Sequence, residues 1–502
     1  GGLLLPGDDN DRLAGAIYGV ASGPLADDKL SFSLAGKAAH KDGFVENLTT
    51  GEKEYAHDTF YGGGKLYWTP TDDLNITAIL SAKSLRQDGN NANRAGGPDR
   101  VVASDLASWQ DVDANMQAIN AQYAISDTMK LTSITTRSDM ELKGEIDFDF
   151  SNMKFVHGRL SADTENLSQE LRLNASLGKW DCLFGVYLDH QEVSYVAQMD
   201  SMNPMYKSAL TTKLTGKSYA GYIDAGYQLT SQIKLLGGLR YAWQEYEFES
   251  TILSGTEEES WTNLSPKIGL QYAFTKNITG YATIAEGYRS GGFNDRAFNP
   301  DYYTYDPETL WSYEVGMKSV LLDNRLVLNG SVFYMDISDM QVEENITLTE
   351  YYLTNATSAT SFGAEVDFTA IVADGLTLYG GFGFVHARFD SFQDALGNYD
   401  DNKLPYAPAY TYNFGAQYRS AAGFYIGGDV TGYGKTWFDK SNSASRNGYA
   451  LVNAKIGYET ENFDIYLYGQ NIFDQKYDVK NWMGMDVYSE PGEIGLQLTM
   501  RF

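Results

Sequence analysis

The clearest pattern in the chain is a strict alternation of apolar and polar residues in short segments. In the last nine positions, 494–502, one face is apolar and the other carries small or polar side chains. The apolar positions are Ile494, Leu496, Leu498, Met500 and Phe502. Alternation with a period of two predicts a β-strand with one apolar and one wet face. The pattern recurs at 268–274 and 451–458, and a chain of such strands ending on an aromatic residue favours a transmembrane β-barrel over a soluble sandwich.

Short clusters of turn-forming residues interrupt the alternating segments at regular intervals. About ten such clusters occur, roughly 40 to 56 residues apart. They lie at 26–28, 71–73, 126–128, 176–179, 230–232, 275–277, 322–324, 373–375, 421–423 and 459–462. Between consecutive turns there is enough chain for two strands of about 10 residues and one longer loop. We therefore expect tight turns on the periplasmic side of a barrel and longer loops on the extracellular side.

Counting the intervals predicts the size of the barrel. Nine intervals hold about eighteen strands, the tail after Glu459 adds two, and the segment 12–25 adds one. Because closed bacterial barrels have an even number of strands, about twenty-one strands indicate a barrel of about 22 over residues 12–502. We expect the first strand of the barrel to be truncated, irregular or outside this numbering. Residues 1–11 would then be the end of a missing plug or of this first strand. A barrel this wide needs a plugged lumen, yet no plug-sized domain is evident in the sequence.

The expected longer loops are rich in Asn, Asp, Gly, Tyr and Arg, as exposed recognition loops tend to be. Their approximate bounds are 84–115, 141–165, 197–218, 289–307, 338–360, 388–405, 436–447 and 478–491.

Composition agrees with a barrel and excludes several other classes. The mean hydropathy of −0.36 looks soluble, but a barrel turns only every second residue toward lipid, so the average hides the membrane face. The 37 tyrosines fit aromatic girdles at the two membrane interfaces. A net charge of −28 excludes a protein that tracks nucleic-acid phosphates. A single cysteine, Cys182, excludes an intrachain disulfide framework. No secretory signal opens the chain, so we expect a mature or trimmed sequence.

Several segments carry a family likeness. They include Ala285-Glu-Gly-Tyr-Arg-Ser-Gly-Gly-Phe-Asn294, the stretch 307–318 and Gly469-Gln-Asn-Ile-Phe-Asp-Gln-Lys-Tyr477. Together with the turn at 22–30 and the terminal Phe502, they resemble the barrel of TonB-dependent outer-membrane receptors. The likeness covers nearly the whole chain, and it is strongest to siderophore receptors related to the pesticin and yersiniabactin receptor.

The resemblance implies active import across the outer membrane of a Gram-negative bacterium. In that family an N-terminal plug fills the barrel, and a short box contacts TonB, which works with ExbB and ExbD. The barrel would also contact the lipid bilayer and lipopolysaccharide. Plug and box are missing from this sequence, so they either lie upstream or belong to a separate chain. The implied ligand is a transported ferric siderophore, with no resident cofactor.

A site for ferric siderophores needs aromatic faces and guanidinium donors, because these chelates are commonly anionic and aromatic or hydroxylated. The candidate ligand-binding residues are Arg86, Arg94, Arg100, Trp109, Arg289, Arg296, Tyr302, Tyr303, Tyr305, Tyr351, Tyr352 and Arg388. For each residue taken alone, a place in an aromatic girdle or a solvated loop remains the alternative. Haem, cobalamin or a glycan could replace the siderophore; for haem, His386 is the candidate axial ligand, although the sequence at 288–293 departs from the haem signature.

Metal binding and catalysis have little support in the sequence. Two acidic groups could hold calcium through oxygen ligands, but neither has a defined loop spacing, so no metal site is predicted. These groups are Asp105, Asp111 and Asp113, and Asp147 and Asp149. No nucleophile–base set or nucleotide fingerprint stands out, so we do not expect an enzyme. A passive porin or an interaction scaffold is the other class, but general porins have about 16 to 18 strands.

Overall fold

A computed structural model describes the chain except for residues 1–11, 27–28, 95–96, 204–206, 252–254, 296, 298, 300–301, 346–350, 395–396 and 483. The regular elements of the described residues are all β-strands. No helix in this part of the chain is both long and apolar enough to cross a membrane.

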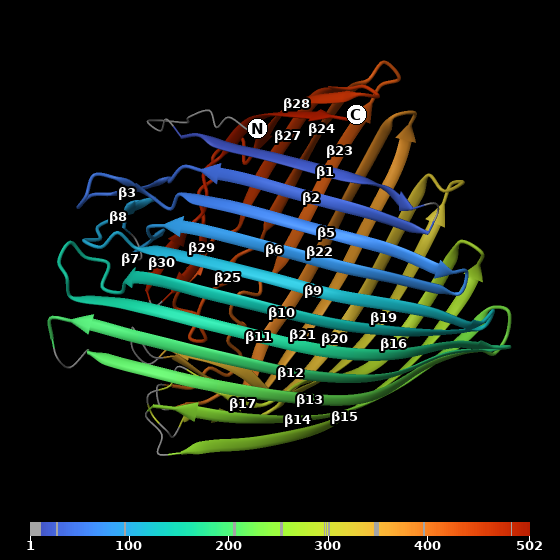
Figure 1. The fold of residues 1–502 in the computed structure, drawn as a ribbon, viewed down its shortest axis with the longest axis horizontal. Helices are drawn as coiled ribbons and strands as arrows, with labels where there is room; N and C mark the ends of the chain where they lie inside the picture. Colours follow the sequence, from blue (N-terminus) through green and yellow to red (C-terminus); the bar gives the residue numbers. More distant parts are fainter. Residues whose placement is uncertain are drawn as a thin grey trace.

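Twenty-one strands form one large sheet in which each strand pairs antiparallel with the next one along the barrel wall. They are β1 (Ala14–Ala26), β2 (Leu30–Lys41), β5 (His57–Thr71), β6 (Leu74–Asp88), β9 (Trp109–Ser126), β10 (Met129–Asp147), β11 (Val156–Leu177), β12 (Trp180–Ser201), β13 (Ser208–Gln228), β14 (Ile233–Ser250), β15 (Thr256–Thr275), β16 (Ile278–Arg289), β19 (Glu308–Leu321), β20 (Leu326–Asn345), β21 (Tyr351–Ala373), β22 (Leu376–Ser391), β23 (Tyr410–Arg419), β24 (Phe424–Tyr433), β27 (Tyr449–Glu459), β28 (Phe463–Gln470) and β31 (Glu493–Met500). The sheet curves round so that β1 to β10 form the front wall of Figure 1 and β19 to β23 lie behind it. The predicted all-β antiparallel barrel and its strand count in this chain are confirmed.

Shorter strands lie in the longer connections and form four small sheets at one end of the barrel. They are β3 (Val45–Asn47), β4 (Lys53–Glu54), β7 (Ala92–Arg94), β8 (Val101–Val102), β17 (Gly292–Phe293), β18 (Thr304–Tyr305), β25 (Thr436–Trp437), β26 (Ser445–Arg446), β29 (Asp478–Trp482) and β30 (Met485–Tyr488). β7 pairs with β30, and β3 pairs parallel with β8, so these pairings tie together connections that are far apart in sequence. We call this end the loop end; it lies on the left of Figure 1.

The opposite end carries the tight turns, and those that the described residues contain lie at the predicted places. Nine of the ten lie within the described residues, whereas residues 27–28 of the first do not. At the turn between β21 and β22, Gly375 has a φ of 76°, and a Cβ there would collide with the carbonyl oxygen of Arg419. Only glycine meets both conditions at that position.

Several predicted loops are shorter than expected because the strands continue into them. β10 and β11 pair without interruption from Met129 to Asp147, so most of 141–165 is strand, and the same holds for 197–218 and 338–360. At these ends of β10 and β11 the outer face is polar, as at Glu141 and Asp163, and apolar residues such as Leu160 lie on the inner face, so the alternation is reversed relative to the lipid-facing part. β11 has 22 residues, each adding about 3.3 Å, whereas a membrane-crossing strand needs about 9–11 residues. The strand is therefore longer than the membrane requires.

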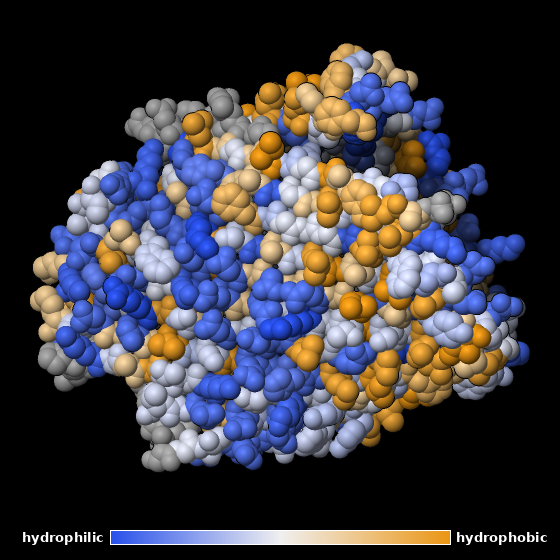
Figure 2. All heavy atoms as spheres, viewed as in Figure 1, coloured by the Kyte–Doolittle hydropathy of each residue, from blue (hydrophilic) through white to orange (hydrophobic). Residues whose placement is uncertain are grey.

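The two faces of the wall differ in chemistry. On β11, Leu167 and Leu171 are exposed on the face that carries Leu188 of β12 in register, whereas Glu170 and Arg172 point the other way. Apolar side chains in continuous rows mark the outer, lipid-facing side, and the polar side is the lumen. Figure 2 shows most of the hydrophobic residues of this outer surface between its middle and the turn end, and mostly hydrophilic residues toward the loop end.

Tyrosine rings and glycines pack together on the lumen side. Rings lie over glycines of the neighbouring strand, where a Cβ would collide with the ring. Pairs of this kind are Tyr222 over Gly185, Tyr281 over Gly316 and Tyr468 over Gly495. The ring covers the backbone of a glycine, which has no side chain of its own. These pairs account for part of the high tyrosine and glycine content of the chain.

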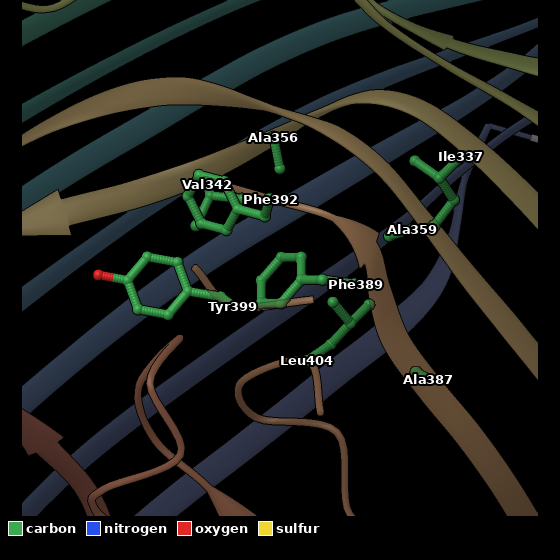
Figure 3. Close-up of a cluster of buried hydrophobic side chains, with 9 residues drawn as sticks. All are labelled: Ile337, Val342, Ala356, Ala359, Ala387, Phe389, Phe392, Tyr399 and Leu404. Carbon is green, nitrogen blue, oxygen red and sulfur yellow. The ribbon is translucent and has the colours of Figure 1, made fainter. Parts of the chain in front are cut away.

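A buried apolar cluster supports the loop end from inside. It joins β20, β21 and β22 to the connection 392–409 through Ala359, Phe389, Phe392 and Tyr399, among others (Figure 3). Phe389 is fully buried, and its ring lies 5.1 Å from that of Phe392. The connection therefore folds against the inner face of the wall and narrows the mouth of the lumen at this side.

Candidate functional site

Two of the predicted aromatic residues meet at the mouth of the loop end. The rings of Tyr302 and Tyr352 stack with centroids 4.3 Å apart and planes 3° from parallel. Tyr352 is 8% exposed and donates to Glu344 at 3.3 Å, whereas Tyr302 is 38% exposed. Burial, with the nearby Glu344 carboxylate, raises the pKa of Tyr352 well above its ordinary value. The pair is a rigid aromatic surface with Tyr302 outermost.

An apolar cluster begins at the residue after Tyr302. Phe248 and Phe293 stack at 5.1 Å, and the ring of the third predicted residue, Tyr303, lies 5.7 Å from Phe248. All three side chains are buried. The predicted tyrosines thus divide: Tyr303 belongs to the supporting core, and Tyr302 faces outward.

The buried amide of Asn294 fixes the stack in place. Its Nδ2 donates to the carbonyl oxygens of Tyr302 at 2.8 Å and Leu353 at 2.9 Å, and its Oδ1 accepts from the Leu353 N–H at 2.7 Å. One side chain therefore joins the connection 290–307 to the start of β21. Sequence reasoning did not single out Asn294, because its partners lie 8 and 59 residues away.

A cationic and an acidic group flank the tyrosines. Burial raises the pKa of Tyr305, and the positive charge of Arg289 opposes that rise. The exposed Arg289 forms no ion pair within the described part of the chain. On the other side, Lys440 bridges Glu344 at 2.8 Å and Asp394. Burial lowers the pKa of Lys440, but the hydrogen bonds to both carboxylates outweigh it and the net shift is upward.

The structure places other predicted residues away from this site. Arg86 is on the outer face and pairs with Asp113 at 2.7 Å. Arg100 is bound to Asp474, Trp109 lies exposed at the outer start of β9, and Arg388 pairs with Asp401 on the outer face. Arg296 lies outside the described residues, as do the side chains of Arg94 and Tyr351.

A second aromatic group at the loop end was not predicted from sequence. Tyr433 and Tyr449 stack at 5.1 Å, and Tyr449 and Tyr477 at 4.1 Å, with the Arg446 guanidinium 5.0 Å from the centre of the Tyr449 ring. The pairing of β24 with β27 brings the first two rings together. Their spacing in sequence carries no signal for this contact.

The candidate metal and haem ligands are engaged with protein groups. His157 is 2.9 Å from Asp105, and Asp111 lies 3.4 Å from Arg86. Among the residues that the structure describes, no group of three or more His, Cys, Asp or Glu side chains is arranged to hold a metal ion. His386 contacts Lys403 at 3.0 Å and shares the outer face of β22 with Phe384, so it does not reach the lumen.

Comparisons with known proteins agree with this architecture. Residues 54–472 match the family described as TonB dependent receptor-like, beta-barrel. The pesticin receptor of Yersinia pestis is 24% identical over 339 residues, covering 63% of this chain and 48% of the receptor. The catecholate siderophore receptor Fiu of Escherichia coli K12 is 23% identical over 296 residues, covering 52% and 38%. The chain thus spans about half the length or less of these curated relatives, each of which is named as a receptor.

Solved structures show the same fold. The ferric yersiniabactin uptake receptor FyuA from Yersinia pestis superposes with a TM-score of 0.84 at 19% identity, covering 98% of this chain and 79% of that one. The siderophore receptor PiuA from Acinetobacter baumannii gives a TM-score of 0.81 at 14% identity, covering 97% and 79%. The sequence match, which covers most of the strands, and the shared fold together lead to one conclusion: this chain belongs to the TonB-dependent receptor β-barrel family of the outer membrane.

Proposed function

We propose that the protein imports a ferric siderophore across the outer membrane of a Gram-negative bacterium. The chelate binds at the mouth of the loop end, which is extracellular, and then passes through the barrel. The observation that carries this proposal is the stacked pair of Tyr302 and Tyr352, whose outer ring is accessible at the mouth. The names of the relatives, pesticin and catecholate siderophore receptors, support it.

The chemistry of the mouth suits an anionic, ring-bearing chelate. The exposed face of Tyr302 offers a stacking surface, and aromatic pairs contribute roughly 0.5–1.5 kcal/mol beyond area burial. Arg289 offers a planar guanidinium that matches carboxylate or catecholate oxygens in a two-point contact. Iron is the cargo here, carried inside the chelate.

Transport through a barrel of this kind requires energy and a gate. We propose that TonB, with ExbB and ExbD, supplies the energy through a plug and a TonB box that the 502 residues do not include. The outer rows of apolar side chains would contact lipid, and the hydrophilic strand ends above them would contact lipopolysaccharide.

The proposal is tested by binding and growth. Cells that rely on the native protein for iron are offered ferric catecholate, phenolate, hydroxamate and citrate complexes, with haem, cobalamin and an oligosaccharide as other cargoes. We expect growth rescue and saturable binding with at least one ferric siderophore, and a loss of affinity of about three- to tenfold in Tyr302→Ala but not in Tyr302→Phe. Rescue by haem, cobalamin or the oligosaccharide alone would replace the siderophore, and no binding of any of them would defeat the proposal.

A further inference from the structure

One lysine side chain links the stacked tyrosines to two connections that supply neither ring. The Nζ of Lys440, in the connection 434–448, lies 2.8 Å from Oε1 of Glu344 and is also bound to Asp394 of the connection 392–409. Glu344 of β20 is the register partner of Tyr352 on β21, and its Oε2 accepts from the Tyr352 hydroxyl at 3.3 Å. Only Glu344 therefore separates Lys440 from the ring that stacks on Tyr302.

The three charged side chains are shielded from water. The exposed fraction of the side chain is 16% for Lys440, 7% for Glu344 and 16% for Asp394. The ammonium group also lies 5.3 Å from the centre of the Phe392 ring and 5.0 Å from that of Tyr399, two rings that Figure 3 shows in the buried cluster. A plug inside the barrel would only add to this burial, so the bridge does not depend on an empty lumen.

Hydrogen bonds fix the backbone from which Lys440 reaches the carboxylates. The Nδ2 of Asn402 donates to the carbonyl oxygen of Lys440 at 2.9 Å. Asn442 accepts from the N–H of Lys403 at 2.8 Å and donates to the Lys403 carbonyl oxygen at 2.9 Å. The connections 392–409 and 434–448 are thus joined on both sides of Lys440. Its side chain starts from a fixed point, and its contact with Asp394 is part of the same junction.

Lys440 balances two carboxylates that would otherwise face each other. Both bind the same nitrogen, so the bonded oxygens of Glu344 and Asp394 lie no more than about 6 Å apart. One ammonium group and two carboxylates carry one net negative charge; without the ammonium group the net charge is two, in a poorly hydrated place. Asp394 is also held within its own connection, because its Oδ1 accepts from the Gly397 N–H at 3.0 Å and the Tyr399 hydroxyl at 3.2 Å. Repulsion should therefore displace Glu344 first.

We propose that Lys440 is a positioning residue of the binding surface: it holds Glu344 against Tyr352 and so fixes the ring on which Tyr302 stacks. This rests on the proposed function, because it takes the stacked pair as the surface that binds the chelate. Lys440 acts through Glu344 and does not contact the chelate itself. A carboxylate held in place and ionised accepts a stronger hydrogen bond than a mobile one, so the Tyr352 hydroxyl keeps a single orientation. Two connections that contribute no ring thereby determine the shape of the aromatic surface.

The test asks whether the charge of Lys440 sets the surface, or only its bulk. The variants are Lys440→Met, Lys440→Arg and the double variant Lys440→Met/Glu344→Gln. The double variant keeps the net charge of the wild-type cluster, and its new amide oxygen can still accept from Tyr352. Lys435→Met is the matched control: Lys435 lies in the same connection, 3.7 Å from the centre of the Trp437 ring, and forms no ion pair with the residues that the structure describes.

Two measurements on the native protein in detergent separate binding from positioning. Dissociation constants are measured with ferric tris-catecholate and with ferric phenolate, hydroxamate and citrate complexes. Hydrogen exchange in 351–356, measured without any chelate, reports on the strand that carries Tyr352. Heat-modifiable migration in electrophoresis checks that each barrel is folded.

We expect Lys440→Met to bind at least about tenfold more weakly and to exchange faster in 351–356, because it leaves a buried carboxylate without its partner. Lys440→Arg, the double variant and Lys435→Met should retain most of the wild-type affinity and the slow exchange. Unchanged binding and exchange in Lys440→Met would overturn the positioning role alone. An equal loss in the double variant would also overturn it, since Lys440 would then only fill space in the loop. Failure of the wild-type protein to bind any of the four ferric chelates would overturn the proposed function, and the exchange rates would still decide whether Lys440 positions Tyr352.

Discussion

Arg100 and Asp474 lie 374 residues apart and form a two-point ion pair, with Nη1–Oδ2 and Nη2–Oδ1 distances of 3.0 Å each. The pair joins an early connection to the last one, next to the place where the edge strands β1 and β31 meet. Among the described residues these strands share no backbone ladder, but Tyr18 and Thr499 are hydrogen-bonded through their hydroxyls at 2.9 Å. Side-chain contacts therefore join the two edges of the wall, at the loop end through Arg100 and Asp474 and nearer the turn end of β31 through Thr499.

Removing the ion pair should loosen the mouth without unfolding the barrel. Asp474→Asn keeps an oxygen to accept from the Gly492 N–H and tolerates the φ of 46° at this position, so it isolates the loss of charge. We expect a local cost of about 1–3 kcal/mol, because the Arg100 guanidinium is largely buried. Hydrogen exchange should become faster in 471–492 and stay unchanged in β11 and β12. Unchanged exchange in 471–492 would show that the pair contributes nothing to loop order.

The stability of the Asp147 region should depend on pH. Burial raises the pKa of Asp147 from 3.8 to about 6, and the charge of Asp149 adds to the rise. Because the folded state then holds the proton more tightly than the unfolded state, this group's stabilising contribution is complete below about pH 4 and is lost as pH rises through 6. At pH 7 the folded protein therefore carries the cost of a buried charge.

Asp147→Asn should remove that cost. The Oδ1 of residue 147 accepts from the N–H groups of Asp149 and Phe150 at 3.0 Å each, and an asparagine keeps both bonds. We expect the variant to be more stable than the wild type by on the order of 1 kcal/mol at pH 8, and the difference to vanish near pH 4. Denaturant titrations in detergent at several pH values measure it. A difference that does not vary with pH would contradict the buried-carboxylate explanation.

A methyl group at Gly316 should damage the lumen wall. A Cβ there would collide with the ring of Tyr281, whose hydroxyl is bound to Glu314. Gly316→Ala should cost about 1–3 kcal/mol through overpacking and reduce the yield of folded barrel. Gly221→Ala is the matched control, because a Cβ at Gly221 has no heavy atom within 4 Å. Equal yields for the two variants would mean that the ring moves aside at no cost.

Asn294 should control the binding surface without touching the cargo. Asn294→Ala removes three buried hydrogen bonds and leaves the Leu353 N–H without its acceptor. We expect a local cost of about 2–3 kcal/mol and weaker binding of whichever chelate the wild-type protein takes up. Asn294→Asp retains the acceptor but turns a buried carboxylate oxygen toward the carbonyl oxygens of Tyr302 and Leu353, so it should weaken binding at least as much as the alanine. The dissociation constants of the wild type and of the two variants are measured on purified protein. Equal constants would show that the position of the stack does not affect binding.

Much of the fold could be predicted from the chain because a barrel strand is defined by its neighbours in sequence. Alternation at 494–502 and turn clusters such as 373–375 are local signals, and the structure follows both. The extent of β10 and β11 toward the loop end could not be predicted. There the outer face of the strands is polar, and Leu160 and Ala162 of β11 pack inside against a buried cluster that includes Leu210, a contact between residues far apart in the chain.

The candidate site could be predicted only in part. Residue type identified Tyr302 and Tyr352 as aromatic surfaces, and they stack. The same reasoning chose Arg86 and Arg388, which are bound to carboxylates on the outer wall. It missed Asn294 and the Tyr433–Tyr449–Tyr477 stack. Whether a side chain can bind a ligand depends on the face of the strand that it occupies and on whether another protein group already binds it.

The sequence by itself determined the class of fold, the places of the tight turns, the number of strands and the family, because period-two alternation and turn residues act over a few positions. Only the tertiary structure decided which loops are joined and which arginines are already paired. Arg100 contacts Asp474, and Tyr433 stacks on Tyr449, because strand pairing brings these parts of the chain together. These contacts depend on hydrogen bonding between strands that are far apart in the chain, and no local sequence pattern predicts them.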